Sequence, residues 1–130
     1  MIGLDTTAII DLFKKDANLK KLLENIDDTF STTVLNYQEI FFGLNPKDPK
    51  YDVEKDFYDD FFNNLILLDF DKESVKKSSD IFWDLSKRGE PIGRFDCMIS
   101  GAFLKNNVGK IITKNAKHFQ KIKGIKVLTY

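Results

Sequence analysis

The sequence predicts a three-layer α/β/α sandwich around a mostly parallel sheet of about five strands. Two observations predict it. Five short apolar segments alternate with segments whose apolar residues recur at helical spacing, which is typical of parallel α/β folds with right-handed crossovers. The 130 residues, 42% of them hydrophobic and twelve of them phenylalanine, are enough for one compact core. We therefore expect a single domain over residues 1–130.

The first part of the chain is expected to contain two strands and three helices. In order, these are the strand MIGL, the helices DTTAIIDLFKK and NLKKLLENI, the strand DTFSTT and the helix VLNYQEIFFGL. Thr6 or Thr7 is available as N-cap of the first helix, and apolar residues at helical spacing follow. DTFSTT is rich in strand-favouring residues, and Gly43 ends the helix after it.

The rest of the chain continues the alternation after a charged loop with two prolines, NPKDPKYD. The expected elements are the helix VEKDFYDDFFNNL, the buried strand LILLDF, the helices KESVKKSSDIFWDLSKRG and RFDCMISGAFLKNN, the strand VGKIIT, a loop or short helix NAKHFQKIKG, and the strand IKVLTY. The first of these helices spaces Val53, Phe57 and Phe61 on one face, opposite a solvated acidic face. Gly89 ends the long helix before the EPIG loop.

Charge and cysteine content narrow the functional classes. Twenty basic and twenty acidic side chains cancel, so a nucleic-acid partner would have to be held by local basic residues or a metal. The single cysteine, Cys97, cannot form an internal disulfide, and no signal-peptide pattern opens the chain, so we expect a cytoplasmic protein. The longest apolar runs fall far short of the roughly twenty residues that span a bilayer.

Polar side chains follow the predicted strands at the edge where parallel sheets bind ligands. Asp5 follows the first strand, Glu39 lies on the helix after the second, Asp96 lies in the first turn of the helix before the fourth, and Thr113 and Asn115 follow the fourth. Taken singly, Asp5 can be a helix cap and Asp96 can be favoured by the helix dipole. Glu39, between apolar neighbours, is harder to explain as a surface residue.

Convergence of three carboxylates requires a compensating charge, because the acids would otherwise repel one another and acquire raised pKa values. Oxygen ligands, one histidine and no cysteine cluster fit Mg²⁺ or Mn²⁺ and not structural zinc. Such an ion polarises a phosphoryl oxygen and generates hydroxide for in-line attack. The pattern therefore indicates phosphodiester hydrolysis.

Four segments that cover the whole chain occur in an informative order and spacing. They are GLDT, STTVLNYQEIFFGL, PIGRFDCMISGAF, and IITKNAKHF followed by a closing strand. Together they resemble the PIN domain and, within that superfamily, the VapC-type toxin ribonucleases of toxin–antitoxin pairs. The resemblance implies that Asp5, Glu39 and Asp96 bind metal, that Thr113 is the site hydroxyl, and that Asn115 belongs to a TxNxxDF-like motif.

The same resemblance implies an activity and partners. We expect a metal-dependent endoribonuclease that cuts single-stranded or looped RNA and leaves a 3′-hydroxyl and a 5′-phosphate. By this resemblance, VapC-like proteins often form homodimers and are inhibited by a small antitoxin. An RNA substrate, a small antitoxin and a second copy of the chain are thus the expected partners, and a membrane is not.

The sequence departs from the family pattern at two positions. Where many members carry a fourth acid, this chain has His118, and the loss of one negative charge favours one tightly held ion over two. A neutral imidazole can still ligate Mn²⁺ or hold a water. Arg94 stands where a small polar residue is more usual, and its guanidinium can pair with a carboxylate or grip the scissile phosphate.

Two further residues are expected to support the site or contact substrate. Thr6 is adjacent to Asp5, and Lys114 is adjacent to Thr113. Lys114 can contact a phosphate, although lysines in such loops usually belong to the solvated surface.

Other groupings have simpler structural explanations. Cys97 is expected to be a small buried hydrophobe, and the acidic group Asp56, Asp59 and Asp60 to be a solvated helix face. No nucleophile elbow accompanies His118, which argues against a catalytic triad. Core packing is also the first explanation for one aromatic group, although its exposure would favour a helix-in-groove partner. That group is Phe41, Phe42, Tyr58, Phe61 and Phe62.

Two alternatives to a nuclease stay open at this point. The first is a PIN scaffold weakened at its fourth acid, which binds RNA or protein without catalysis. The second is a receiver-like or phosphatase α/β domain, which fits poorly because Asp5 is followed by Thr6 and Thr7 and not by a second acid.

Overall fold

A parallel five-stranded sheet forms the centre of the computed structural model, which describes residues 1–130. The strands are β1 (Ile2–Leu4), β2 (Phe30–Thr33), β3 (Ile66–Leu68), β4 (Lys110–Ile112) and β5 (Lys126–Leu128). Their order is β3-β2-β1-β4-β5, and every neighbouring pair is parallel. The predicted fold class is confirmed. The order makes β2, β1 and β4 neighbours, so their carboxyl ends meet at one edge.

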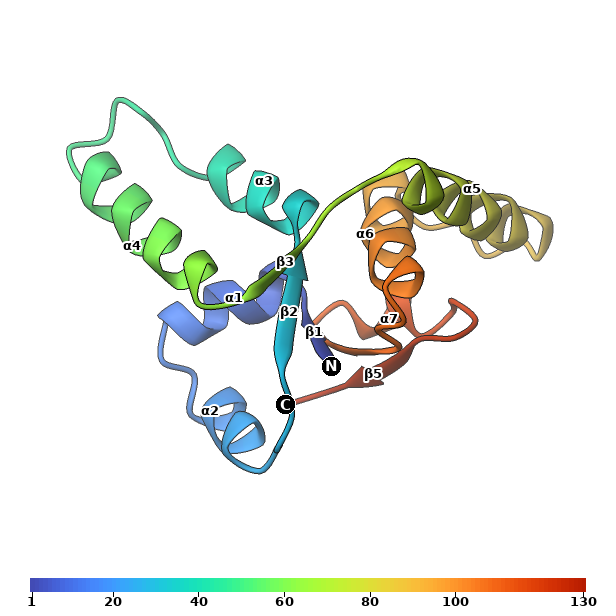
Figure 1. Ribbon diagram of the computed structural model, residues 1–130, viewed down its shortest axis with the longest axis horizontal. Coiled ribbons are helices and arrows are strands. Elements are labelled where there is room, and N and C mark those ends of the chain that lie inside the picture. Colours follow the sequence, from blue (N-terminus) through green and yellow to red (C-terminus); the bar gives the residue numbers. More distant parts are fainter.

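Seven helices cover the two faces of the sheet. They are α1 (Thr6–Phe13), α2 (Ala17–Glu24), α3 (Val34–Phe42), α4 (Tyr51–Asn63), α5 (Lys72–Lys87), α6 (Arg94–Lys105) and α7 (Ala116–Phe119). Figure 1 shows α1 to α4 on one side of the strands and α5 and α6 on the other. No helix combines the length and the apolar character needed to cross a membrane.

Side-chain alternation along the central strands supplies one hydrophobic core to each layer of helices. Ile112 packs with Ile2 and Leu4 in the core beneath α1 to α4, whereas its neighbour Ile111 belongs to the core beneath α5 and α6. Gly3 faces this second core, where a Cβ atom would lie only 2.6 Å from the ring of Phe103. A side chain at position 3 would therefore collide with the α6 layer.

Two local expectations were wrong. Thr6 and Thr7 are not the N-cap of α1; the N-cap is Asp5, which was the other candidate, but its side chain makes no capping hydrogen bond because it is directed to other partners. The strand LILLDF was expected to be buried, but β3 is an edge strand on which Ile66 and Leu67 are exposed. An edge strand has a neighbour on one side only, so fewer elements cover it.

Helix α4 also differs from its expected pattern. Val53 and Phe57 are 74% and 60% exposed, so the apolar stripe at the start of the helix is not buried. The helix is anchored instead near its C-terminal end, where Phe62 is buried. The acidic face is not uniformly solvated either, because Asp59 is half-buried and accepts a hydrogen bond from Tyr37.

Candidate active site

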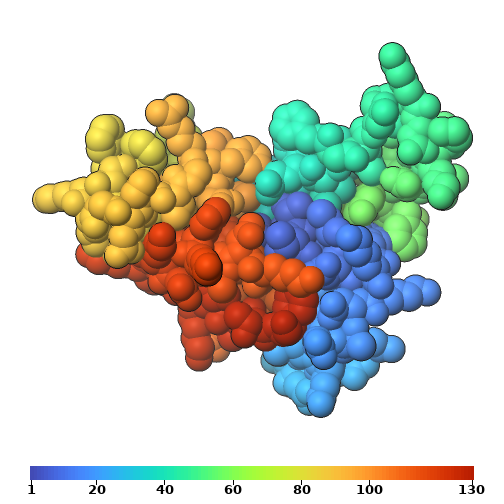
Figure 2. Space-filling view, turned by 180° about the vertical axis from the view of Figure 1, so that it is seen from behind, coloured from blue at the N-terminus to red at the C-terminus, as the bar shows by residue number.

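The candidate site lies at the carboxyl ends of three neighbouring strands. Asp5 follows β1, α3 follows β2 directly, and Thr113 follows β4. Figure 2 shows the blue N-terminal segment lying between the teal of α3 and the orange of the segment around β4. Segments that are far apart in the sequence, at residues 5, 34–42 and 113, therefore form this edge together.

Asp5 is the buried centre of the site, with only 2% of its surface exposed. Its Oδ1 atom accepts a hydrogen bond of 3.0 Å from the Asn36 amide, and its Oδ2 atom accepts one of 2.8 Å from the Thr113 hydroxyl. Burial raises the pKa of the Asp5 carboxyl, and the negative charge of Asp96 raises it further, while these hydrogen bonds act in the opposite direction.

Glu39 is held on α3 by a short hydrogen-bond chain. The Thr6 hydroxyl donates to Glu39 Oε1 at 2.7 Å and accepts from Asn36 Nδ2 at 3.1 Å. The pKa of Glu39 is raised first by burial and then by the charges of Asp5 and Asp96. The three acids are therefore close enough to repel one another.

Asp96 lies in the first turn of α6, as expected from the sequence. Its Oδ2 atom is 2.7 Å from Nδ1 of His118, whose side chain is half-exposed. The residue that departs from the family pattern thus contacts one of the three acids directly.

Thr113 connects the loop after β4 to α1. Its hydroxyl oxygen is 3.2 Å from the Thr7 hydroxyl and accepts a hydrogen bond of 3.0 Å from the Asn115 backbone N–H. The backbone N–H of Lys114 donates to Thr7 at 3.0 Å. Asn115 therefore contributes its backbone here, while its side chain is exposed and makes no hydrogen bond within the chain.

These segments are matched by a known family model. The model described as PIN domain matches residues 2–125. The chain belongs to the PIN domain family.

Two similar proteins and two solved structures bear further on this PIN domain. It is 30% identical over 67 residues to a tRNA(fMet)-specific endonuclease VapC of Salmonella typhimurium, a stretch that covers 52% of this chain and 50% of that protein. The corresponding protein of Shigella flexneri is 29% identical over 66 residues, which cover 51% of this chain and 49% of that protein. The matched stretch spans about half the length of each relative.

Solved structures match the fold over nearly the whole chain. VapBC2 from Rickettsia felis, bound to a DNA fragment from its promoter, has a TM-score of 0.82 at 24% identity and covers 100% of this chain and 99% of that chain. DNA-bound VapBC from Salmonella typhimurium has a TM-score of 0.84 at 22% identity and covers 98% and 96%. At these identities the likeness shows a shared fold.

The donor chemistry of this PIN domain fits a hard divalent cation. Asp5, Glu39 and Asp96 are close enough to repel one another, and none of them pairs with a lysine or an arginine. As the side chains stand, no three Asp, Glu, His or Cys residues converge closely enough to hold an ion together. Thr6 donates a hydrogen bond to Glu39, and His118 contacts Asp96. Uncompensated negative charge on oxygen ligands is the condition that Mg²⁺ or Mn²⁺ relieves.

Two expected substrate contacts lie outside the carboxylate network. Lys114 Nζ is 2.8 Å from Asp11 Oδ2 and lies over the Tyr130 ring, so its charge is directed at α1. Arg94 forms no ion pair, and its guanidinium carbon lies 5.5 Å from the centroid of the Phe82 ring. Arg94 therefore does not pair with a carboxylate, which was one of the two roles considered for it; the other is contact with the scissile phosphate.

Sequence reasoning missed Asn36 and Thr7, both of which contact expected site residues. Asn36 is fully buried, and its amide joins Asp5 to Thr6. A signal for it existed: Thr33 and Asn36 have the three-residue spacing of a capping box, which the structure contains. Asn36 also lies one turn before the buried Ile40, on the inner face of α3.

Proposed function

We propose that this PIN domain is a metal-dependent endoribonuclease in which Asp5, Glu39 and Asp96 hold Mg²⁺ or Mn²⁺. One observation carries the proposal: two of the three acids have pKa values raised by burial and mutual repulsion, and no lysine or arginine neutralises them. A protein that only bound RNA or another protein would gain nothing from this repulsion. The family and the names of the two VapC relatives support the same activity.

The chain's own residues prepare the acids for this role. Asn36 and Thr113 fix the orientation of the Asp5 carboxylate from opposite sides, and Thr6 orients Glu39. When bound, a divalent cation supplies Lewis-acid stabilisation of the phosphoryl oxygens and lowers the pKa of a coordinated water. The expected products are a 3′-hydroxyl and a 5′-phosphate.

His118 has a distinct place in the proposal. Its Nδ1 atom contacts Asp96, so the ring orients this acid and brings no negative charge of its own. One metal ion is therefore favoured over two. The presence of His118 in place of a fourth acid is also the observation that favours the alternative function. In that alternative, the PIN scaffold binds RNA or protein without cutting.

RNA cleavage tests the function directly. Purified protein is incubated with a mixed RNA pool that includes tRNA, the substrate named for the two VapC relatives, in Mg²⁺, Mn²⁺ or EDTA. We expect cleavage with metal only, loss of cleavage in Asp96→Asn, and retention in Asp60→Asn, an exposed acid on α4. If the unmutated protein is inert with every metal and Mn²⁺ does not raise its melting temperature, the binding-module alternative replaces the nuclease.

We further propose that a small antitoxin covers the α3–α4 end of the molecule. Phe42 at the end of α3 and Val53 and Phe57 on α4 are 77%, 74% and 60% exposed there, which is an unusual exposure for large apolar side chains. An amphipathic helix laid along this surface would bury them. The solved neighbours are VapBC complexes, which supports a partner of this kind.

Partner binding is separable from catalysis. In a pull-down with a candidate antitoxin, Phe57→Glu is expected to lose binding and to keep RNA cleavage, while Val75→Glu, an exposed apolar position on α5, keeps both. Equal binding by both variants would contradict the proposed surface.

We also propose that the protein is a cytoplasmic homodimer. Light scattering coupled to gel filtration measures the mass that tests the dimer.

A further inference from the structure

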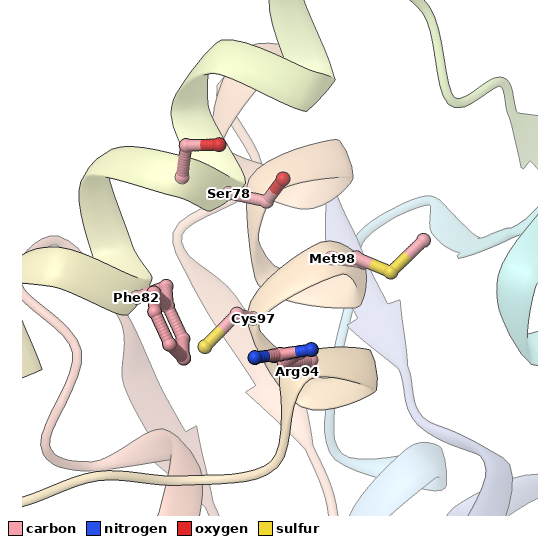
Figure 3. Close-up of a pocket in the computed structure, with 6 residues that line it drawn as sticks. Ser78, Phe82, Arg94, Cys97 and Met98 are labelled. Carbon is pink, nitrogen blue, oxygen red and sulfur yellow. The ribbon is translucent and has the colours of Figure 1, made fainter. Parts of the chain in front are cut away.

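A cavity of about 270 Å³ lies between α5 and α6, outside the carboxylate cluster. It is lined by Ser78, Ser79, Phe82, Arg94, Cys97 and Met98. Figure 3 shows Phe82 on the α5 side and Arg94 on the first turn of α6, with the sulfur of Cys97 between them. None of the three acids lines this cavity, so it is a separate feature of the surface.

Arg94 provides a positive charge at the cavity that nothing in the chain neutralises. The chain has two arginines. Arg88 is committed, because its Nη2 atom lies 2.8 Å from Asp84 Oδ2 and donates to the Lys121 carbonyl at 2.7 Å. Arg94 is exposed and has no carboxylate partner, so its planar guanidinium is free to bind a phosphate.

Aromatic side chains lie beside this charge. The Phe82 ring lines the cavity, and Trp83 packs edge-to-face against it with ring centroids 5.2 Å apart. Trp83 is 68% exposed, although burial of an indole is normally favourable. Aromatic rings combined with an arginine form the kind of surface on which the bases of single-stranded nucleic acids stack.

A polar group is also available for the edge of a base. Ser79 is exposed, and its hydroxyl makes no hydrogen bond within the chain, whereas the Ser78 hydroxyl is already bonded to the Val75 carbonyl at 2.9 Å. The cavity thus combines an aromatic ring, a guanidinium that lies over one face of this ring, and a free hydroxyl. These groups match the base, the phosphate and the polar edge of a nucleotide.

The cavity lies within a short distance of the candidate active site. Arg94 and Cys97 flank Asp96 in the first turn of α6, but they are directed to α5, whereas Asp96 is directed to His118. A helix with its side chains is about 10–12 Å wide. A single strand that passes the N-terminal end of α6 would therefore meet both places within a few nucleotides.

We propose that the α5–α6 cavity is a subsite for one nucleobase of single-stranded RNA near the scissile bond, with the base against Phe82 and its phosphate on Arg94. The inference rests on the proposed nuclease function and assigns part of its substrate contact. Stacking is tolerant of base identity, so the subsite selects an unpaired nucleotide and not a particular base.

The single tryptophan gives a direct test, because Trp83 is the only indole in the chain and packs against Phe82, which lines the proposed subsite. An eight-nucleotide oligouridylate is titrated in EDTA, so that binding is measured without cleavage. We expect the emission of Trp83 to be quenched. Arg94→Gln and Phe82→Leu are expected to weaken binding and so raise the Kd by about fivefold or more. Arg88→Gln, the matched control, should leave the Kd unchanged, and melting curves verify that each variant is folded.

Cleavage measured with metal on the same samples separates the two proposals. If RNA is cut but Trp83 is not quenched, or if the Arg94 and Arg88 variants bind equally, the subsite is wrong while the nuclease stands. If the oligonucleotide binds in an Arg94-dependent way and no metal supports cleavage, the subsite stands while the nuclease fails. A change of Trp83 emission with protein concentration alone would assign this face to contact between copies and overturn the subsite.

Discussion

The Thr113 hydroxyl donates its one proton to the Asp5 carboxylate at 2.8 Å, across 108 positions of sequence. Because that proton is engaged, the neighbouring Thr7 hydroxyl is left to donate its own proton, either to Thr113 at 3.2 Å or to Asp5 Oδ2 at 3.5 Å. The Thr113 oxygen also accepts from the backbone N–H of Asn115. One side chain therefore holds α1, the end of β4 and the buried acid in a single arrangement.

Replacement of Thr113 by valine keeps the shape and removes the hydroxyl. The N–H of Asn115 loses its acceptor and Asp5 loses a donor, so we expect Thr113→Val to lower the free energy of unfolding by about 1–3 kcal/mol. Metal affinity should fall by about 10–100-fold, the usual effect of removing a group that orients a ligand. Denaturant unfolding and titration with Mn²⁺ measure the two effects. Thr113→Ser should restore most of both, and failure of serine to do so would contradict a role for the hydroxyl.

Asp5→Asn should change the pH dependence of stability in the absence of metal. Burial raises the pKa of Asp5 in the folded state. The stability associated with its protonated form is therefore present below the ordinary pKa of 3.8 and is lost as the pH rises through the raised value. Asparagine carries no charge at any of these pH values, but its amide nitrogen replaces one oxygen that accepts from Asn36 or Thr113. In EDTA the melting temperature of the variant relative to that of the unmutated protein should therefore be higher at pH 7 than at pH 4.

The same melting curves contain the control for Asp5→Asn. The relative melting temperature of the variant should fall as the pH decreases through the raised pKa of Asp5 toward 3.8, because the aspartate then takes up its proton. Added Mn²⁺ should raise the melting temperature of the unmutated protein and leave that of the variant unchanged. A melting-temperature difference that is the same at pH 7 and at pH 4 would contradict a raised pKa at Asp5.

The pH dependence of the stability that Asp71 contributes is expected to be opposite to that of Asp5. It caps α5 through the backbone N–H of Ser74, and Lys105 Nζ lies 2.7 Å from its other oxygen. Lys105 and these hydrogen bonds lower the pKa of Asp71 to about 2. The stability that it contributes is thus present above 3.8 and is lost as the pH falls through about 2. Asp71→Asn keeps the cap and removes the charge, so its deficit in melting temperature at pH 6 should vanish near pH 2 and decrease with added salt.

Gly101 tests the contact that shapes the α5–α6 layer. A Cβ atom on Gly101 would lie 2.8 Å from the Ser74 carbonyl oxygen and from the backbone nitrogen of Ser78. Backbone atoms of a packed helix cannot move aside, so we expect Gly101→Ala to destabilise the fold by about 1–3 kcal/mol despite the better helix propensity of alanine. Gly93→Ala, where nothing lies within 4 Å of the added carbon, is the control. Equal unfolding free energies for the two variants would show that α5 can shift.

Local patterns were enough for the alternation of elements and for the edge at which the acids lie. The helix that begins at Val34 and ends before Gly43 is an example, because capping and termination are properties of a few adjacent residues. Placement of Asp5 beyond β1 and of Thr113 beyond β4 needed one additional rule, that the carboxyl ends of parallel strands share an edge. The resemblance to PIN domains came from the same short segments.

Contacts between residues that are distant in the sequence could not be predicted from local patterns. Nothing local distinguishes Lys114, which pairs with Asp11, from a lysine free to contact phosphate, since both would lie in a polar loop. Val53 and Phe57 have the periodicity of a buried face, but periodicity shows only that a face is apolar and not that another element covers it.

The sequence by itself therefore determined the fold class, the family and the strand ends that carry the acids, because these depend on short-range periodicity and on motifs of a few residues. Only the tertiary structure decided that Asn36 holds Asp5, that His118 contacts Asp96 and that Arg94 faces Phe82. Each of these contacts joins different secondary-structure elements. Their geometry is set by how the helices pack on the sheet, a property of the whole core that no single segment contains.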